Sequence, residues 1–185
     1  MSPEHDEHLH EAPVSRRPIY AGRLIRVFDD TVRLPDGRET HREVVEHPGA
    51  VTIVAIDASD RVVLVRQWRH AWLTTAWEVP AGTMEPGEEP LACAQRELRE
   101  EAGLIANDWT PLGISRGTAL LTGRQHLFLA RGLRRVQRTP EPAERDMILR
   151  EVPFQTALDA ALGGEIEHAA AISALVRAAR VLGLI

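Results

Sequence analysis

Lysine is absent from the sequence, cysteine occurs once, and aromatic residues make up only 4% of it. The single cysteine, Cys93, can form neither an intramolecular disulfide nor a cysteine-rich zinc site. No apolar run approaches the roughly 18 residues of a membrane-spanning helix, and the N-terminus has neither an apolar signal core nor a basic leader. These absences predict a cytoplasmic protein that does not associate with membranes.

The charge balance is acidic. All 22 basic side chains are arginine, against 27 Asp and Glu, which gives a formal net charge of −5. A general nucleic-acid or membrane-surface binder usually needs a net basic face, so the balance argues against both partners. Arginine nevertheless suits bidentate contacts with phosphate. The 185 residues are enough for one compact domain with a small appendage.

A short helix is predicted over 91–102, a run rich in helix-forming residues. Pro90 at its start suits a first helical turn, and Gly103 just beyond its end suits a left-handed cap. At about 100° per residue, its apolar residues gather on one arc and three glutamates gather on another. The helix can therefore pack against a core while it presents acids elsewhere.

The three glutamates, Glu97, Glu100 and Glu101, repel one another at spacings of three and four residues. Arg96 and Arg99 lie elsewhere on the helical wheel, so we expect the helix itself not to offset this repulsion. A solvated acidic face is one interpretation. The other is a metal platform, because Mg²⁺ prefers oxygen ligands and usually shares protein carboxylates with substrate phosphates.

Residues before, within and after this helix follow a pattern that favours the metal platform. They resemble the Nudix box, Gx5Ex7REUxEExGU, in which U is a bulky aliphatic residue. Every fixed position is matched, by Gly82, Glu88, Arg96, Glu97, Leu98, Glu100, Glu101, Gly103 and Leu104. The resemblance implies a Nudix hydrolase, which cleaves a nucleoside diphosphate linked to a further moiety and uses Mg²⁺, or Mn²⁺ in its place, as cofactor.

The order of predicted elements favours the α/β class. Apolar and alternating segments predict strands before the helix, at 51–56, 62–69 and 76–79, and after it, at 109–115, 126–130 and 147–152. Two further helices, over about 154–162 and 168–182, close the chain. This order predicts an α/β sandwich with a mixed sheet. The resemblance implies the same architecture, a Nudix-type α/β/α sandwich, here with a small N-terminal β appendage.

Stretches outside the box resemble one branch of the family, the ADP-ribose and ADP-sugar pyrophosphatases. They lie at 42–50, 65–69, 77–82 and 164–166. This resemblance implies a small-molecule nucleotide-sugar substrate. It also implies metal contacts from the Ala81 carbonyl, Glu97 and Glu101, with Glu100 close to the same ions.

Three arginines are candidates for substrate contacts. The resemblance implies that Arg69 holds the diphosphate, and its place at the end of a predicted strand beside the box suits a bidentate phosphate clamp. Arg66 is a second candidate for that role. Arg42 stands, with Leu24, where relatives place aromatic residues that clamp the nucleobase. Arginine can stack on a base, whereas leucine gives a weaker platform.

The resemblance also implies a general base, a loop glutamate before the last strand that orients or deprotonates the attacking water. Glu144 is the best match, and Glu141 and Asp146 are near enough to serve instead. Glu144 joins the three box glutamates as the predicted catalytic set.

Three regions are predicted along the chain. Residues 1–15 carry histidines, acids and prolines with little to pack, so we expect a disordered tail. Residues 16–48 form a β hairpin region, with its turn at 34–37 because Asp-Gly tolerates positive φ. Residues 49–185 form the Nudix domain. Relatives in the branch exchange the hairpin region between subunits, so the resemblance implies a homodimer.

Two departures from the branch leave the substrate open. The region 117–124 lacks the proline and acidic residues that many members have beyond the box, and Leu24 stands in place of an aromatic residue. A GDP- or UDP-linked sugar is therefore an alternative to ADP-ribose. A non-catalytic sugar-nucleotide-binding regulator is another, against which the intact box carboxylates argue. Prenyl diphosphate isomerisation would need a catalytic cysteine, and Cys93 lies inside the predicted helix.

Overall fold

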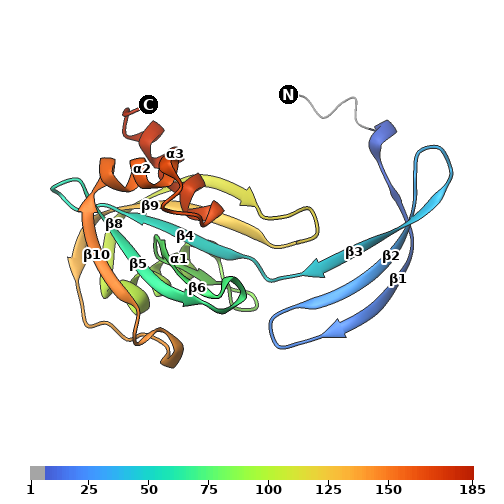
Figure 1. The fold of residues 1–185 in the computed structure, drawn as a ribbon, viewed down its shortest axis with the longest axis horizontal. Coiled ribbons are helices and arrows are strands. Elements are labelled where there is room, and N and C mark those ends of the chain that lie inside the picture. Colours follow the sequence, from blue (N-terminus) through green and yellow to red (C-terminus); the bar gives the residue numbers. More distant parts are fainter. Residues whose placement is uncertain (1–6) are drawn as a thin grey trace. The chain divides into compact units, whose positions relative to one another are not determined.

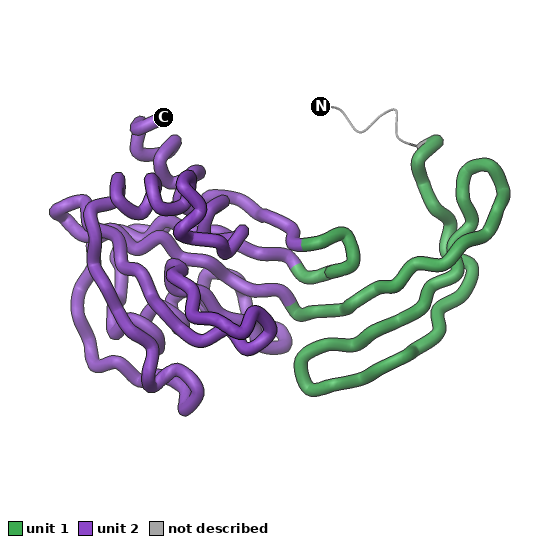
Figure 2. Tube along the Cα trace, in the orientation of Figure 1, with its two compact units in different colours: residues 1–48, 118–123 green, residues 49–117, 124–185 purple. Residues whose placement is uncertain are grey.

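The computed structural model of the chain describes residues 7–185, which fall into two units (Figure 2). Unit 1 contains the described residues up to Pro48 together with Thr118–Gly123. Unit 2 contains Gly49–Gly117 and Arg124–Ile185. Unit 2 thus begins at the residue where the Nudix domain is predicted to begin, and the loop 118–123 is an addition to unit 1 that no sequence pattern suggests.

Unit 1 is a three-stranded antiparallel sheet. Its strands, in spatial as in sequence order, are β1 (Ala12–Ala21), β2 (Arg26–Arg33) and β3 (Glu39–Glu46), preceded by the 3-10 turn η1 (Glu7–Leu9). The turn at 34–37 joins β2 to β3. Gly37 has a φ of 86°, in the left-handed region that glycine adopts readily at the end of an Asp-Gly turn.

The N-terminal segment differs from the predicted disordered tail. Residues 1–6 lie outside the described residues, but 7–9 form η1 and 12–15 belong to β1. β1 pairs with β2 from Ala12 onward, and Ala12 lies opposite Arg33. This backbone pairing gives residues 12–15 their regular structure. The region predicted as a hairpin is therefore a three-stranded sheet that starts earlier in the chain.

Unit 2 contains seven strands and three helices. The strands are β4 (Ala50–Ala55), β5 (Arg61–Arg69), β6 (Thr74–Glu78), β7 (Ala81–Thr83), β8 (Leu104–Arg116), β9 (Arg124–Arg135) and β10 (Ile148–Pro153). The helices are α1 (Pro90–Ala102), α2 (Phe154–Gly163) and α3 (Ala169–Val181), and the 3-10 turns are η2 (His70–Trp72) and η3 (Pro142–Glu144). One sheet has the order β7-β4-β9-β8 and is mixed, because β4 and β9 run parallel; the other, β10-β5-β6, is antiparallel.

Alternating side chains of β4 separate two apolar layers. Val51, Ile53 and Ala55 belong to the buried cluster that packs on α1, whereas Val54 and the following Ile56 belong to the cluster that packs on α2 and α3. Figure 1 shows α1 on one side of β4 and the two C-terminal helices on the other. The predicted α/β sandwich with a mixed sheet is confirmed.

The limits of α1 agree with the prediction, since Pro90 occupies its first turn and Gly103 caps it at φ 62°. β8 and β9 extend well beyond the predicted strands, because they pair with each other as a long ribbon whose outer positions are polar. In the part of the chain that the structure describes, no helix has the length and apolar character to span a membrane.

β8 is an outer strand, paired with β9 on one side. Pro111 has no backbone N–H to offer, and the pairing register shifts between Pro111 and Gly113. Arg177 of α3 donates hydrogen bonds to the carbonyls of Leu112, at 3.0 Å, and Ile114, at 3.2 Å. This stretch therefore leaves little open backbone for another strand to pair with.

Candidate active site

The loop between β6 and α1 brings strand backbone against a helical carboxylate. Gly82 of β7 has no side chain, and a Cβ atom there would lie 1.9 Å from the carboxyl carbon of Glu97. β7 also pairs with β4, with Ala81 opposite Thr52, which fixes the loop on the sheet. The box glycine thus permits a close approach between this strand and α1.

Glu97 and Glu101 are buried carboxylates beside that loop. Glu101 is 1% exposed, and its Oε2 accepts a hydrogen bond from the Ala81 N–H at 2.9 Å. Burial raises the pKa of Glu97 to about 7 and that of Glu101 well above its usual range. The second oxygen of each carboxylate receives no hydrogen bond from the described residues. Both side chains therefore have an oxygen available for a cation.

Arg96 offsets part of the repulsion among the box acids, so the expectation drawn from the helical wheel is wrong. Its Nη1 donates to Glu97 at 2.7 Å and to Glu100 at 3.1 Å. Its Nε and Nη2 donate to the two oxygens of Glu88, in the loop before α1, at 2.9 and 3.0 Å. Arg96 and Glu100 are four residues apart and therefore neighbours on the helix surface, whereas Glu88 is reached only because the loop before α1 folds back. One guanidinium still leaves the group of Glu88, Glu97, Glu100 and Glu101 with a net negative charge.

Glu144 lies in the loop before β10, as the last residue of η3. A capping box with Glu141 fixes this turn, and Arg138 donates to the Glu144 carbonyl at 2.9 Å. Burial, with a contribution from nearby carboxylates, raises the pKa of Glu144. The two alternative bases, Glu141 and Asp146, are exposed, whereas Glu144 is half-buried.

Arg69 of β5 stands near the same acids. Its Nε and Nη2 donate to the two oxygens of Glu78, at 2.6 and 2.7 Å. This pairing is the main cause that raises the pKa of Arg69, and the carboxylates of Glu101 and Glu144 add to it. The structure therefore brings Arg69, Glu101 and Glu144 together, with Glu97 close to both acids.

The other two predicted arginines have different surroundings. Arg66 is three residues from Arg69, so the two project from opposite faces of β5. Arg66 donates to Thr75 at 3.1 Å and lies over the Trp77 ring, 5.6 Å from its centroid. Arg42 belongs to unit 1, where it pairs with a glutamate of the same unit, Glu11, at 2.5 Å.

Two functional candidates were missed by reasoning from the sequence, Glu78 and His168. Glu78 is fully buried, and His168 Nδ1 lies 2.8 Å from its Oε2, at an angle too oblique for a regular hydrogen bond. Glu78 did carry a signal, because an acid between Trp77 and Val79 in an apolar strand needs a buried cation. His168 carried none, since it lies far along the chain, before α3.

The donor set beside β7 fits a hard cation. Within residues 7–185, no three His, Cys, Asp or Glu side chains are grouped closely enough to hold a metal ion by themselves. Glu97 and Glu101 nevertheless provide two buried carboxylates, each with an unbonded oxygen, next to the backbone of Ala81. Divalent cations such as Mg²⁺ take such oxygen ligands and complete their shells with water and substrate phosphates.

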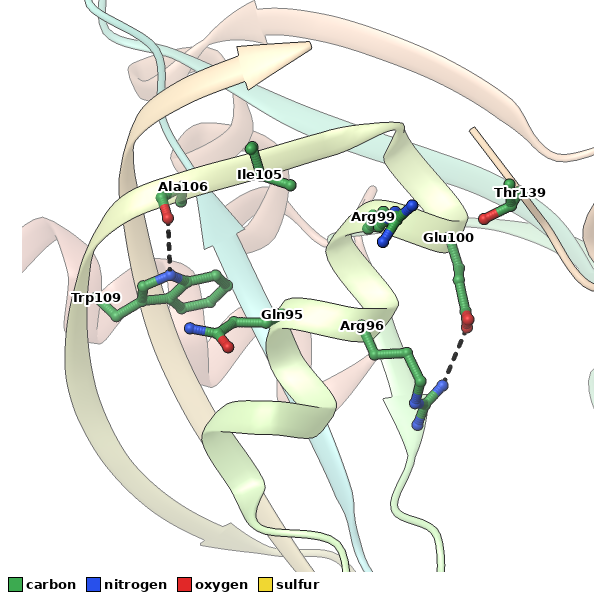
Figure 3. Close-up of a pocket in the computed structure, with 8 residues that line it drawn as sticks. All are labelled: Gln95, Arg96, Arg99, Glu100, Ile105, Ala106, Trp109 and Thr139. Atoms are coloured by element: carbon green, nitrogen blue, oxygen red, sulfur yellow. Dashed lines mark hydrogen bonds and ion pairs between the residues drawn. The ribbon is translucent and has the colours of Figure 1, made fainter. Parts of the chain in front are cut away.

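A cavity of about 540 Å³ lies along the outer side of α1 (Figure 3). It is lined by Gln95, Arg96, Arg99, Glu100, Ile105, Ala106, Trp109 and Thr139. Figure 3 shows Arg96 and Glu100 directed at each other on one side and the Trp109 indole held by the Ala106 carbonyl on the other, at 3.2 Å. The cavity thus shares two charged residues with the acidic group.

Family models match nearly the whole described chain. Residues 46–175 match the NUDIX domain, and residues 13–45 match the nucleoside diphosphate sugar hydrolase N-terminal domain. The two matches meet close to the boundary between unit 1 and unit 2.

Similar proteins carry related descriptions. The ADP-ribose pyrophosphatase of Mycobacterium tuberculosis is 38% identical over 167 residues, which is 88% of this chain and 80% of that protein. The ADP-ribose pyrophosphatase of Bacillus subtilis is 34% identical over 157 residues, 81% of this chain and 82% of that one. A crystal structure described as an ADP compounds hydrolase has the same fold, with a TM-score of 0.81 at 22% identity over 95% of this chain and 97% of the other.

Proposed function

The chain belongs to the NUDIX family, and we propose that it hydrolyses the diphosphate of ADP-ribose or a related nucleoside diphosphate sugar, releasing a nucleoside monophosphate and a sugar phosphate. The observation that carries the proposal is that Glu97 and Glu101 lie beside β7 and that Arg69, Glu97 and Glu101 are all within electrostatic reach of Glu144. A diphosphate needs both a cationic contact and acids that hold a divalent cation.

Glu97, Glu101 and the Ala81 carbonyl are the proposed metal contacts, with Glu100 beside them, and Mg²⁺ is the proposed cation. A bound divalent cation supplies charge neutralisation at the diphosphate and a water of lowered pKa. Support comes from the two buried carboxylates, whose raised pKa values reflect the cost of holding negative charge there without a cation. Mn²⁺ takes the same ligands.

The remaining steps belong to the chain's own side chains. Arg69 contacts the diphosphate oxygens, and Glu144 orients the attacking water and accepts its proton. Support for Glu144 comes from its half-buried position and raised pKa, which make it a better proton acceptor near neutral pH than an exposed glutamate. Arg96 holds Glu97 and Glu100 in place through its ion pairs.

Nucleotide choice is assigned to unit 1. Arg42 is proposed to contact the nucleobase, and the loop 118–123, which differs from the ADP-ribose branch, belongs to the same unit. A GDP- or UDP-linked sugar therefore remains within the proposed substrate class. Arg66 is a weaker candidate for substrate contact, because its guanidinium is engaged by Thr75 and Trp77.

A homodimer in the cytoplasm is the proposed state. Unit 1 exposes apolar side chains that include Val14, Ile19 and Leu24. A three-stranded sheet needs an apolar face or a packing partner for stability, and a second copy of the chain would provide one. Sedimentation at micromolar concentration is the check, and a monomer there would contradict this part of the proposal.

A substrate panel tests the activity. The protein is incubated with ADP-ribose, ADP-glucose, GDP-mannose and UDP-glucose in the presence of Mg²⁺, and the products are resolved by ion-exchange chromatography. We expect a nucleoside monophosphate from at least one substrate and none when EDTA replaces Mg²⁺. Absence of any nucleoside monophosphate across the panel would contradict the proposed function.

A further inference from the structure

We propose that Glu78, supported by His168, positions Arg69 so that one side of its guanidinium is presented to the substrate diphosphate. The inference rests on the proposed function, because it concerns the arginine assigned to the diphosphate. Glu78 and His168 are positioning residues, since they act through Arg69.

The donors of Arg69 are divided in a way that suits this role. A guanidinium has five N–H donors in one plane. Nε and one N–H of Nη2 are taken by the two oxygens of Glu78, at 2.6 and 2.7 Å. Nη1 receives no partner among the described residues, and Nη2 keeps a second N–H. These remaining donors form an end-on fork, which matches a pair of phosphate oxygens.

The Glu78 side chain is itself held in place by the residues around it. Its side chain is 0% exposed, and it lies on β6 opposite Val65 of the same strand as Arg69. His168 Nδ1 is 2.8 Å from Glu78 Oε2, and the Trp72 ring covers the imidazole with ring centroids 6.1 Å apart. A buried carboxylate without its cation is strongly unfavourable, so orientations of Glu78 that release Arg69 are disfavoured.

The free side of Arg69 is accessible. The side chain is 34% exposed, although Glu78 is fully buried. The carboxylates of Glu101 and Glu144 also act electrostatically on this guanidinium, so the proposed metal contacts and general base lie within range of its charge. A buried ion pair is weak evidence for a purely stabilising role, because well-packed apolar residues often do as well. An ion pair with one fork buried and the other free is better explained by orientation.

The test uses five variants and a control. They are Glu78→Gln, His168→Gln, Arg69→Gln, the two double variants that combine Arg69→Gln with Glu78→Gln or with His168→Gln, and the control Glu151→Gln, whose carboxylate pairs with Arg135 away from the site. For each, kcat and KM are measured with ADP-ribose and Mg²⁺, the Kd for ADP by calorimetry, and Tm by scanning calorimetry. ADP serves as a diphosphate probe that requires no turnover.

We expect Glu78→Gln to raise the KM for ADP-ribose and the Kd for ADP by roughly 10- to 100-fold, as for other residues that orient a contact group. kcat should change less, because the diphosphate is charged before as well as during hydrolysis. In the Arg69→Gln background, Glu78→Gln should cause no further loss of ADP affinity, since its effect passes through Arg69. The control should stay within about twofold of wild type, as expected for a distant surface pair.

Unchanged ADP affinity in Glu78→Gln, or losses that simply add in the double variant, would overturn the proposal. If Glu78→Gln does not fold, His168→Gln is the test instead. We then expect a smaller loss of ADP affinity, and no further loss when His168→Gln is combined with Arg69→Gln. Failure of the wild type to bind ADP at millimolar concentration would overturn the proposal as well. A wild type that binds ADP but cleaves no nucleotide sugar would instead contradict the proposed function. In that case the ADP affinities of the single and double variants would still test the role of Glu78.

Discussion

The two units differ most in what holds them together. Unit 2 buries two apolar clusters, one on each side of β4. Among the described residues of unit 1, Val32 is the one apolar side chain that is buried, and ion pairs such as Arg16 with Asp30 take the place of a core. Because a core supplies most of the stability of a small domain, we expect unit 2 to be stable by itself and unit 1 to depend on further contacts.

The same kind of ion pair also serves different ends in the two units. In unit 2, Glu78 is fully buried against Arg69, so loss of Arg69 leaves a buried carboxylate without its main cation. In unit 1, Arg16 is 46% exposed and Asp30 is partly exposed, so water can replace much of a lost partner. A buried pair such as that of Glu78 with Arg69 is therefore suited to fixing a position, whereas an exposed pair such as that of Arg16 with Asp30 is suited only to favouring the pairing of strands.

The largest effect is expected from Glu101→Gln. Turnover should fall at least roughly 100-fold, the upper end of the losses caused by residues that merely support a metal ligand. Stability in EDTA should hardly change, because the raised pKa of the buried Glu101 already favours its neutral form and glutamine has nearly the same shape. Steady-state kinetics and thermal unfolding check both parts. Unchanged turnover would remove Glu101 from the metal site, and with it the assignment of the chemistry to unit 2.

The second largest effect is expected from low pH, which protonates Glu78 and so lowers the stability of the fold. Burial raises the pKa of this carboxyl, but the pairing with Arg69 and His168 outweighs burial and lowers it to about 2, from an ordinary value of 4.5. A lowered pKa means that the contribution to stability is present above about pH 4.5 and is lost as the pH falls toward 2, for a total of about 3 kcal/mol.

Urea unfolding between pH 5 and pH 2.5 measures this loss. The dependence should be shallower in Glu78→Gln, which has no carboxyl to protonate at that position. An equally steep dependence in the variant would assign the acid sensitivity to other carboxylates, such as those of unit 1.

A smaller change in stability, with a selective loss of activity, is expected from Gly82→Ala. The added Cβ would meet the Glu97 carboxylate at 1.9 to 2.4 Å, and that carboxylate can turn away because it ends a flexible side chain. We expect a cost of roughly 1 kcal/mol, at the low end for overpacking, and a clear fall in turnover. Gly163→Ala is the matched control, since nothing lies within 4 Å of a Cβ there. Equal turnover in both variants would contradict the steric role of Gly82.

The smallest effect is expected in unit 1, from Arg16→Gln. This removes pairs with Asp30 and Glu46 at 2.6 and 2.8 Å, both at the surface. Tm should fall slightly at low ionic strength and should equal that of wild type in about 1 M salt, where screening shortens the range of exposed charges. A loss of Tm that persists in high salt would show that unit 1 is held by more specific contacts than its exposure suggests.

What could be predicted from the sequence was local. The spacing of Glu97, Glu100 and Glu101, with Pro90 and Gly103 at the helix limits, depends on one helix, and the structure has that helix as predicted. The α/β sandwich with a mixed sheet followed from alternation and element order, whereas the order of the strands within each sheet was not predicted.

What could not be predicted depends on side chains that meet from distant segments. The reach of Arg96 to Glu88 requires the fold of the loop before α1, which no helical wheel contains. The contact between Glu78 and His168 joins β6 to the start of α3. The opposite directions of Arg66 and Arg69, by contrast, follow from strand alternation alone.

The outer strand β8 has backbone groups that are already hydrogen-bonded or absent, and this affects how the protein should behave in concentrated solution. An outer strand with open N–H and C=O groups is a template on which other chains can add strands and form fibrils. Arg177 and Pro111 close that template at β8, and β1, an outer strand of unit 1, carries Pro13 and Pro18. We therefore expect ordered fibre growth not to start from these two outer strands when the protein is concentrated.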